Sequence, residues 1–160
     1  MLGGPQAGFI VGRADLIAAI NRNPLKRALR LDKVRIAAIE ATLRLYRDPD
    51  RLGERLPTLA LLGRPREEIA ALAERLAPLV AARLGLPVDA VPCASQVGSG
   101  ALPVESLPSA GLRIGGGEPE ALAARLRALP HPVLGRIRDG AVLLDLRCLT
   151  EPDKLLAALG

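Results

Sequence analysis

Runs of apolar residues at two different spacings divide the first part of the chain into extended and helical segments. Residues 8–11, Gly-Phe-Ile-Val, form a short apolar run that is typical of a buried strand, and residues 14–20 have the spacing of a short helix. Asn23 followed by Pro24 is typical of a helix start, because asparagine caps the first turn and proline is tolerated there. We expect this second helix to run to about Arg47.

The predicted helix from residue 24 to residue 47 has a broad apolar face, formed by Val34, Ile36, Ala37, Ile39, Ala41, Leu43, Leu45 and Tyr46. Because so wide a stripe exceeds what one neighbour can cover, it predicts burial against more than one element. Residues 48–57, DPDRLGERLP, then interrupt the pattern with two prolines, a glycine and many charges. We place a domain boundary here and divide the chain into residues 1–50 and residues 51–160.

The second half of the chain alternates strand-like and helix-like segments. Asp139-Gly140 is a strong two-residue hairpin signal between two apolar runs, and Thr150 is expected to cap a last helix near Pro152. Residues 96–109 are rich in glycine, serine and proline and are expected to form a loop. The other predicted elements are strands at 59–63, 90–95, 111–114, 132–138 and 141–149 and helices at 65–84 and 118–129. This order predicts a small α+β sandwich with its helices on one face.

Positive charge is concentrated in residues 21–35. This segment holds six cations against one acid, Asp32, which gives +5, and the whole chain also has a formal net charge of +5. Such a local concentration favours an anionic partner over a diffusely basic surface. Aromatic residues make up only 1% of the chain, so stacking on nucleic-acid bases is not available. Any contact with RNA is therefore expected to be directed to phosphates and to weaken with salt.

Cysteine, histidine and hydropathy patterns exclude several classes of protein. Cys93 and Cys148 lack the spacing of metal ligands, and we expect two reduced, buried thiols and no metal site. His131 lies between two prolines without the partners of a Ser-His-acid triad. We expect no signal peptide, because the start lacks a basic segment followed by a long apolar stretch, and no membrane span, because no uncharged apolar run reaches about 18 residues. We expect a cytoplasmic protein with no membrane partner.

Several motifs, taken in their order along the chain, resemble one known family. They are LGGPQAG, IVG, NPLKRALRLDK, LRLYRDP, LPTLALL, SQVGSGALPVESLPS and PVLGRIRDGAVLLDLRCL, which together cover essentially the whole chain. In these motifs the chain resembles bacterial selenocysteine synthases, the L-seryl-tRNA(Sec) selenium transferases. The resemblance implies a fold-type-I pyridoxal-phosphate (PLP) enzyme, so the fold class is expected to run from α/β to α+β. Residues 1–50 would then end the large PLP domain and include a long linking helix, and residues 51–160 would form the small C-terminal α+β domain.

The resemblance also implies a catalytic amine that this chain does not contain. In the family the loop reads Asp-Lys-Leu-Leu-Gly-Gly-Pro-Gln, and its lysine forms a Schiff base with PLP. Met1 falls on the first leucine of this motif, so the lysine would directly precede it and no catalytic residue is expected within the chain. The loop beside the cofactor would comprise Gly3, Gly4, Pro5 and Gln6. We expect the isolated chain to be inactive, because PLP chemistry needs that amine.

Arg27 and Arg30 are the residues that we expect to bind an anion. They are three positions apart on the predicted helix and hence share a face, and the helix start would add free N–H groups and a positive dipole end. Two guanidinium groups suit a tetrahedral oxyanion, and the alternative is a solvated basic helix face. The resemblance places the family's selenophosphate-binding arginines at these two positions. Lys26 and Lys33 would strengthen the positive electrostatic potential around these two arginines.

Two further regions are weaker candidates for the site. The loop Gly98-Ser99-Gly100 lacks the lysine and the spacing of a phosphate-binding motif, but the resemblance implies that it faces the active site. Arg136 and Arg147 lie on the predicted hairpin strands, and small domains of this fold class often supply an arginine to the substrate carboxylate, for which Arg136 is the candidate. The alternatives are ordinary turn chemistry for the loop and a surface or salt-bridged role for the arginine.

The resemblance finally implies a reaction and a set of partners. The family converts seryl-tRNA(Sec) to selenocysteinyl-tRNA(Sec) with selenophosphate as donor and PLP as cofactor, in ring-like homo-oligomers built from dimers. Two other interpretations stay open. One is a fragment of another fold-type-I PLP enzyme, such as a carbon–sulfur lyase or an aminotransferase, against which the basic segment argues. The other is a non-catalytic module that binds RNA or protein through residues 22–35.

Overall fold

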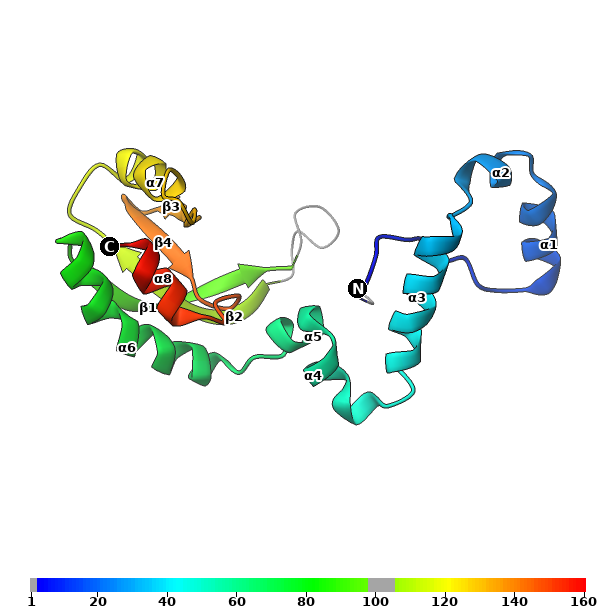
Figure 1. Cartoon of the computed structure of the whole chain (residues 1–160), viewed down its shortest axis with the longest axis horizontal. Coiled ribbons are helices and arrows are strands. Elements are labelled where there is room, and N and C mark those ends of the chain that lie inside the picture. The colour runs from blue at the N-terminus through cyan, green and yellow to red at the C-terminus, as the bar shows by residue number, and fades with distance from the viewer. Residues whose placement is uncertain (1–2, 98–105) are drawn as a thin grey trace. The chain divides into compact units, whose positions relative to one another are not determined.

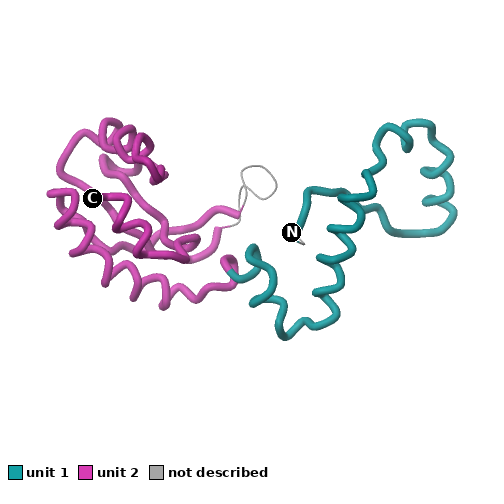
Figure 2. Tube along the Cα trace, in the orientation of Figure 1, with its two compact units in different colours: residues 1–60 teal, residues 61–160 magenta. Residues whose placement is uncertain are grey.

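The computed structural model describes residues 3–97 and 106–160 and divides the chain into two compact units (Figure 2), Met1–Ala60 and Leu61–Gly160. Unit 1 is helical and unit 2 mixes helices with one sheet (Figure 1). No helix in the described part of the chain combines the length and apolar character that crossing a bilayer demands.

Unit 1 contains two helices where the sequence predicts one long helix from residue 24 to residue 47, so that prediction is wrong. The backbone leaves the helical region at Arg30, whose ψ is 140°, and re-enters it after Asp32. The Asp32 carboxylate accepts a hydrogen bond from the Arg35 N–H at 2.9 Å, which makes Asp32 the cap of a new helix. The elements are α1 (Ala14–Arg22), α2 (Leu25–Leu29), α3 (Lys33–Leu45), the 3-10 turn η1 (Pro49–Arg51), α4 (Leu52–Arg55) and α5 (Pro57–Leu62), the last crossing into unit 2.

Unit 1 leaves most of its apolar side chains exposed. The predicted buried strand at residues 8–11 is absent, since these residues carry no secondary structure and the Val11 residue is 90% exposed. On α3 only Ile39 is buried, and Val34 is 79% exposed. The broad apolar face is therefore only partly covered within unit 1, and the full burial that its pattern predicts would require further protein surface.

Unit 2 is a four-stranded antiparallel sheet in the order β1-β2-β4-β3 with three helices, which confirms the α+β class for this part. The run at 59–63 is not the predicted strand, because it lies in helix α5, where the Ala60 N–H donates to the Leu56 carbonyl. A short apolar run is compatible with either element, so periodicity alone could not decide. The elements are α6 (Arg66–Leu84), β1 (Val88–Gln96), β2 (Ser106–Ile114), α7 (Pro119–Arg127), β3 (Arg136–Arg138), β4 (Ala141–Asp145) and α8 (Pro152–Ala158).

The core of unit 2 lies between the three helices and one face of the sheet. Alternate residues of the central strands face it, Leu112 and Ile114 from β2 and Val142 and Leu144 from β4. The helices contribute Ile69, Leu72, Ala73, Leu76, Ala77, Val80, Leu122, Ala123, Leu126 and Leu155. Because all three helices contribute to this core, they cover the same face of the sheet.

Turn and cap predictions in unit 2 have mixed outcomes. Asp139 and Gly140 have φ angles of 49° and 68°, so the predicted hairpin between β3 and β4 is confirmed. Thr150 is not the cap of the last helix, because α8 begins one residue later and has Glu151 in the cap position. The predicted loop at 96–109 is wrong at both ends, since Gln96 lies in β1 and Ser106 begins β2, and residues 98–105 lie outside the described residues.

Glycine at position 111 is required by the close approach of two strands. A Cβ atom there would collide with the carbonyl oxygen of Leu144 on β4. We expect Gly111→Ala to lower the free energy of unfolding by about 3 kcal/mol, because neither backbone can move without disturbing the ladder. Urea denaturation of the 160-residue chain measures this. Gly117→Ala is the matched control, since a Cβ at that position meets nothing, and equal stability of the two variants would contradict the prediction.

Candidate functional site

Arg27 and Arg30 do not share a helical face, so the geometric argument for pairing them is wrong. Arg27 lies in α2, whereas Arg30 follows the last residue of that helix in an extended conformation. Both residues are exposed, and neither guanidinium group makes a hydrogen bond or an ion pair with the residues that the structure describes. Their guanidinium groups thus remain available to a ligand, and anion binding by the pair stays a prediction.

The start of α2 offers no free N–H groups, contrary to the sequence-based expectation. The Leu25 N–H donates to the Asn23 side chain at 2.9 Å, and the Lys26 N–H donates to the Asn23 carbonyl at 3.1 Å. The Arg27 N–H donates to the Pro24 carbonyl at 3.2 Å. Since α2 has only 5 residues, an anion bound here would be held by side chains and not by a helix terminus.

Most of the basic segment lacks acidic partners. Asp32 is the one acid among residues 21–35, and its carboxylate lies 3.6 Å from the Arg35 guanidinium. The other cations make no ion pair with any described residue; they are Arg22, Lys26, Arg27, Arg30 and Lys33. All of them are exposed. The segment therefore presents five uncompensated positive charges within 12 residues.

Two glycines of the Gly3–Gln6 loop pack tightly within unit 1. Gly3 and Gly4 have φ angles of 74° and 75°, which side-chain-bearing residues rarely adopt. A Cβ on Gly4 would collide with the Thr42 side chain of α3, and one on Gly3 would come within 3.3 Å of Leu56. The glycines thus allow the loop to lie against these side chains. The role beside a cofactor stays a prediction, and the other loop candidate, Gly98-Ser99-Gly100, lies outside the described residues.

Arg147 follows β4 and is a buried polar side chain of unit 2, with only 4% of the residue exposed. Its Nη1 donates to the carbonyls of Leu61, Leu62 and Arg64 at 3.0–3.2 Å, and Nη2 donates to the carbonyl of Pro108 on β2. No carboxylate lies within ion-pair distance of this guanidinium in the described chain. Two of its acceptors are the last carbonyls of α5, where the negative end of the helix dipole favours a cation.

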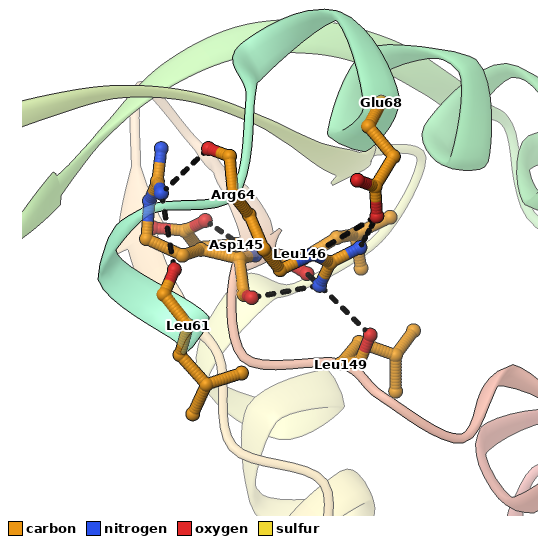
Figure 3. Close-up of polar contacts among 7 residues, drawn as sticks. Leu61, Arg64, Glu68, Asp145, Leu146 and Leu149 are labelled. Carbon is orange, nitrogen blue, oxygen red and sulfur yellow. Dashed lines mark hydrogen bonds and ion pairs between the residues drawn. The ribbon is translucent and has the colours of Figure 1, made fainter. Parts of the chain in front are cut away.

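Arg64 makes the reciprocal set of contacts. Its Nη1 donates to the carbonyls of Leu146, Arg147 and Leu149 at 3.2, 2.7 and 3.0 Å, and its Nη2 pairs with Glu68 on α6 at 3.1 Å (Figure 3). Each arginine therefore binds backbone carbonyls of the segment that carries the other. We call these two arginines and their carbonyl acceptors the arginine clasp, and it ties residues 61–64 to the end of β4.

Asp145 supports the clasp through two serine hydroxyls. Both Ser95 and Ser109 donate to its carboxylate, and Ser95 in turn accepts from the Arg147 Nε at 3.2 Å. Burial raises the pKa of Asp145, but hydrogen bonds from the two serines and from the Arg147 N–H outweigh this and hold the pKa below its usual value. The carboxylate is therefore ionised at neutral pH. Burial raises the pKa of the nearby Cys93 thiol, which disfavours a reactive thiolate.

Arg136 lies partly buried at the edge of this cluster. Its Nη2 donates to the Ala94 carbonyl at 2.7 Å, and its Nε is buried without a hydrogen-bond partner. The Nη2 group of this guanidinium is thus occupied by a backbone contact within unit 2. A contact with a substrate carboxylate stays a prediction.

Sequence reasoning missed the clasp and its supports. The sequence pattern predicts a hairpin strand that includes Arg147, whereas β4 ends at Asp145, and it indicates no role for Arg64, Ser95, Ser109 or Asp145. One signal was present, because an aspartate inside the apolar run AVLLDL must be satisfied by polar partners if that run is buried. The partners themselves come from β1 and β2, 36–50 residues away.

Metal and cofactor ligands are sparse in the described chain. No group of three histidine, cysteine or carboxylate side chains could hold a metal ion among residues 3–97 and 106–160. Both cysteines are free thiols as expected, but Cys148 is exposed and Cys93 only partly buried. Of the three lysines, Lys26 and Lys33 are exposed in the basic segment, and Lys154 pairs with Glu151 at 2.7 Å. Lys154 lines a pocket together with Asp145 and Glu151, but the lysine is paired with Glu151 and the Asp145 carboxylate accepts from Ser95 and Ser109, so the described residues do not fit a covalently bound PLP.

Comparisons with known proteins agree with one another over nearly the whole chain. The family model described as L-seryl-tRNA selenium transferase matches residues 1–150. Curated proteins named L-seryl-tRNA(Sec) selenium transferase match 99% of the chain, with 64% identity in Rhizobium meliloti, 61% in Methylocella silvestris and 57% in Klebsiella pneumoniae (strain 342). The chain spans about a third of their length, 35% for the first two and 36% for the third.

Replacing Arg147 should unfold unit 2 more easily. Arg147→Lys keeps the charge but loses the forked donors, so several buried carbonyls and Ser95 lose their partner. We expect the free energy of unfolding of the chain to fall by about 3 kcal/mol, as measured by urea denaturation. Arg127→Lys on the exposed surface of α7 is the control and should be nearly neutral. A clasp variant as stable as this control would show that the carbonyl contacts contribute little.

Proposed function

Because this chain belongs to the L-seryl-tRNA selenium transferase family, we propose that it is the C-terminal portion of an enzyme that converts seryl-tRNA(Sec) to selenocysteinyl-tRNA(Sec). The reaction replaces the hydroxyl oxygen of the seryl group by selenium, with selenophosphate as donor. The family match over nearly the whole chain does not favour the other two interpretations, a different PLP enzyme or a non-catalytic module.

The observation that supports a donor site is that the side chains of Arg27 and Arg30 are available to a ligand. Both guanidinium groups are exposed and lack a partner in the described chain. Phosphate oxygens are the acceptors that guanidinium groups bind best, through paired charge-assisted hydrogen bonds. Although the two residues do not share a helical turn, they are three positions apart in the chain and both long side chains are exposed. We therefore propose that they hold the phosphoryl group of selenophosphate.

The remaining requirements lie outside this chain. PLP belongs to the proposal for the complete enzyme, and its lysine would have to come from the preceding part, since none of the three lysines here suits it. We propose that residues 1–50 complete the large domain of that enzyme and that residues 51–160 form its small domain. The exposed apolar residues Phe9, Ile10 and Val11 and the apolar face of α3 would be covered by the large domain or by a second subunit of a homo-oligomer. The reaction is proposed to take place in the cytoplasm.

Loss of Arg27 or Arg30 should impair use of the donor. In the complete enzyme, we expect Arg27→Ala and Arg30→Ala each to lower kcat/KM for selenophosphate at least about tenfold, because each removes a charge-assisted contact. Affinity for seryl-tRNA(Sec) should change little. Steady-state kinetics with varied donor and a binding assay with tRNA measure the two effects. Arg75→Ala on the exposed surface of α6 is the control, and equal loss of donor use and tRNA binding would contradict a dedicated donor site.

The isolated chain should not bind PLP as a stoichiometric imine. We expect titration of the 160-residue chain with PLP to give little absorbance in the imine band, at roughly 420 nm. The absorbance should be no greater than that of a variant with all three lysines changed to arginine. The complete enzyme should show the band at one equivalent. A stoichiometric band in the isolated chain that disappears in the lysine-free variant would mean that Lys26, Lys33 or Lys154 can hold the cofactor.

A further inference from the structure

The basic segment carries more uncompensated charge than a small donor needs. Two guanidinium groups suffice to hold one phosphoryl group in the proposed function. Three other cations of the segment are also exposed and unpaired in the described chain, namely Arg22, Lys26 and Lys33. They contribute +3 at positions for which neither the fold nor the donor provides a counter-charge. A second anion of larger extent would account for them.

The position of Lys33 is unfavourable for the protein alone. It is the first residue of α3, at the positive end of the helix dipole, and the first turn of that helix contains no acid. Arg35 in the same turn is compensated by Asp32, but Lys33 is not. A cation at this place therefore destabilises the helix unless an external anion lies nearby.

We propose that Arg22, Lys26 and Lys33 contact the phosphodiester backbone of the substrate tRNA. The inference rests on the proposed function, in which the tRNA must bring its aminoacyl end to the same place as the donor. The three cations flank Arg27 and Arg30 on both sides in the sequence, so a backbone that approaches the donor site would meet them. The segment contains no aromatic side chain for stacking on bases, and phosphates are the groups that exposed lysines and arginines bind without reading sequence.

The test is a triple variant, Arg22→Gln/Lys26→Gln/Lys33→Gln, in the complete enzyme. We expect its affinity for seryl-tRNA(Sec) at about 0.1 M salt to fall at least tenfold, on the order of what three lost phosphate contacts cost. The slope of log Kd against log salt should fall by about 2 to 3, since each contact releases close to one counterion. The KM for selenophosphate should stay within about twofold. Arg75→Gln/Arg125→Gln/Arg127→Gln is the control, because it removes the same charge from exposed, unpaired positions of unit 2.

Each outcome decides between the two proposals. Unchanged tRNA affinity and salt slope in the triple variant would overturn the RNA contact. A raised KM for selenophosphate with unchanged tRNA binding would also overturn it, and would extend the donor site to these cations while the proposed function stands. Poly-glutamate serves as a probe for an acidic protein partner. If the triple variant binds poly-glutamate more weakly but binds tRNA as before, the RNA contact is overturned in favour of an acidic protein. If instead Arg27→Ala and Arg30→Ala leave donor use intact, the donor site fails, and the triple variant still judges the RNA contact by itself.

Discussion

A buried guanidinium whose partners are backbone carbonyls and one serine hydroxyl is the interaction on which unit 2 depends. Arg147 is almost fully enclosed, yet no described carboxylate pairs with it directly. Burial of an unpaired charge would be costly, and here the cost is offset by carbonyl dipoles from two separate segments, residues 61–64 and Pro108, and by Asp145 acting through Ser95. Because the donors of a guanidinium point in fixed directions, the arrangement fixes where these segments lie relative to one another.

Unit 1 has the opposite character. Five cations at positions 22–33 make no ion pair with a described residue, and many of its large apolar residues are exposed. Ile39 and Leu56 are the buried hydrophobic residues of its described part. A segment that buries so little gains little stability from its own packing. Its conformation therefore serves to present side chains outward, and the charges that it presents are those that the family resemblance connects with the donor anion.

The candidate site was predictable only in part. Arg27 and Arg30 were found from charge and from the family resemblance, and the structure leaves both of them free. The geometric reason offered for pairing them was wrong, since Asp32 starts a new helix and Arg30 falls in the bend before it. An aspartate inside a helical pattern competes for backbone N–H groups as a cap, and the periodicity of apolar residues does not register that competition.

The sequence by itself determined the elements whose signals are local. These include the α6 helix, the Asp139-Gly140 hairpin, the α+β class of the second half and the concentration of charge in one segment. Tertiary structure alone decided which apolar runs are buried, and it placed 59–63 in a helix and left 8–11 exposed. It alone also joined Arg64, Asp145 and Arg147 to serines and carbonyls that lie tens of residues away. Periodicity and turn chemistry act over a few residues, whereas burial and hydrogen-bond partners depend on which distant segments the fold brings together.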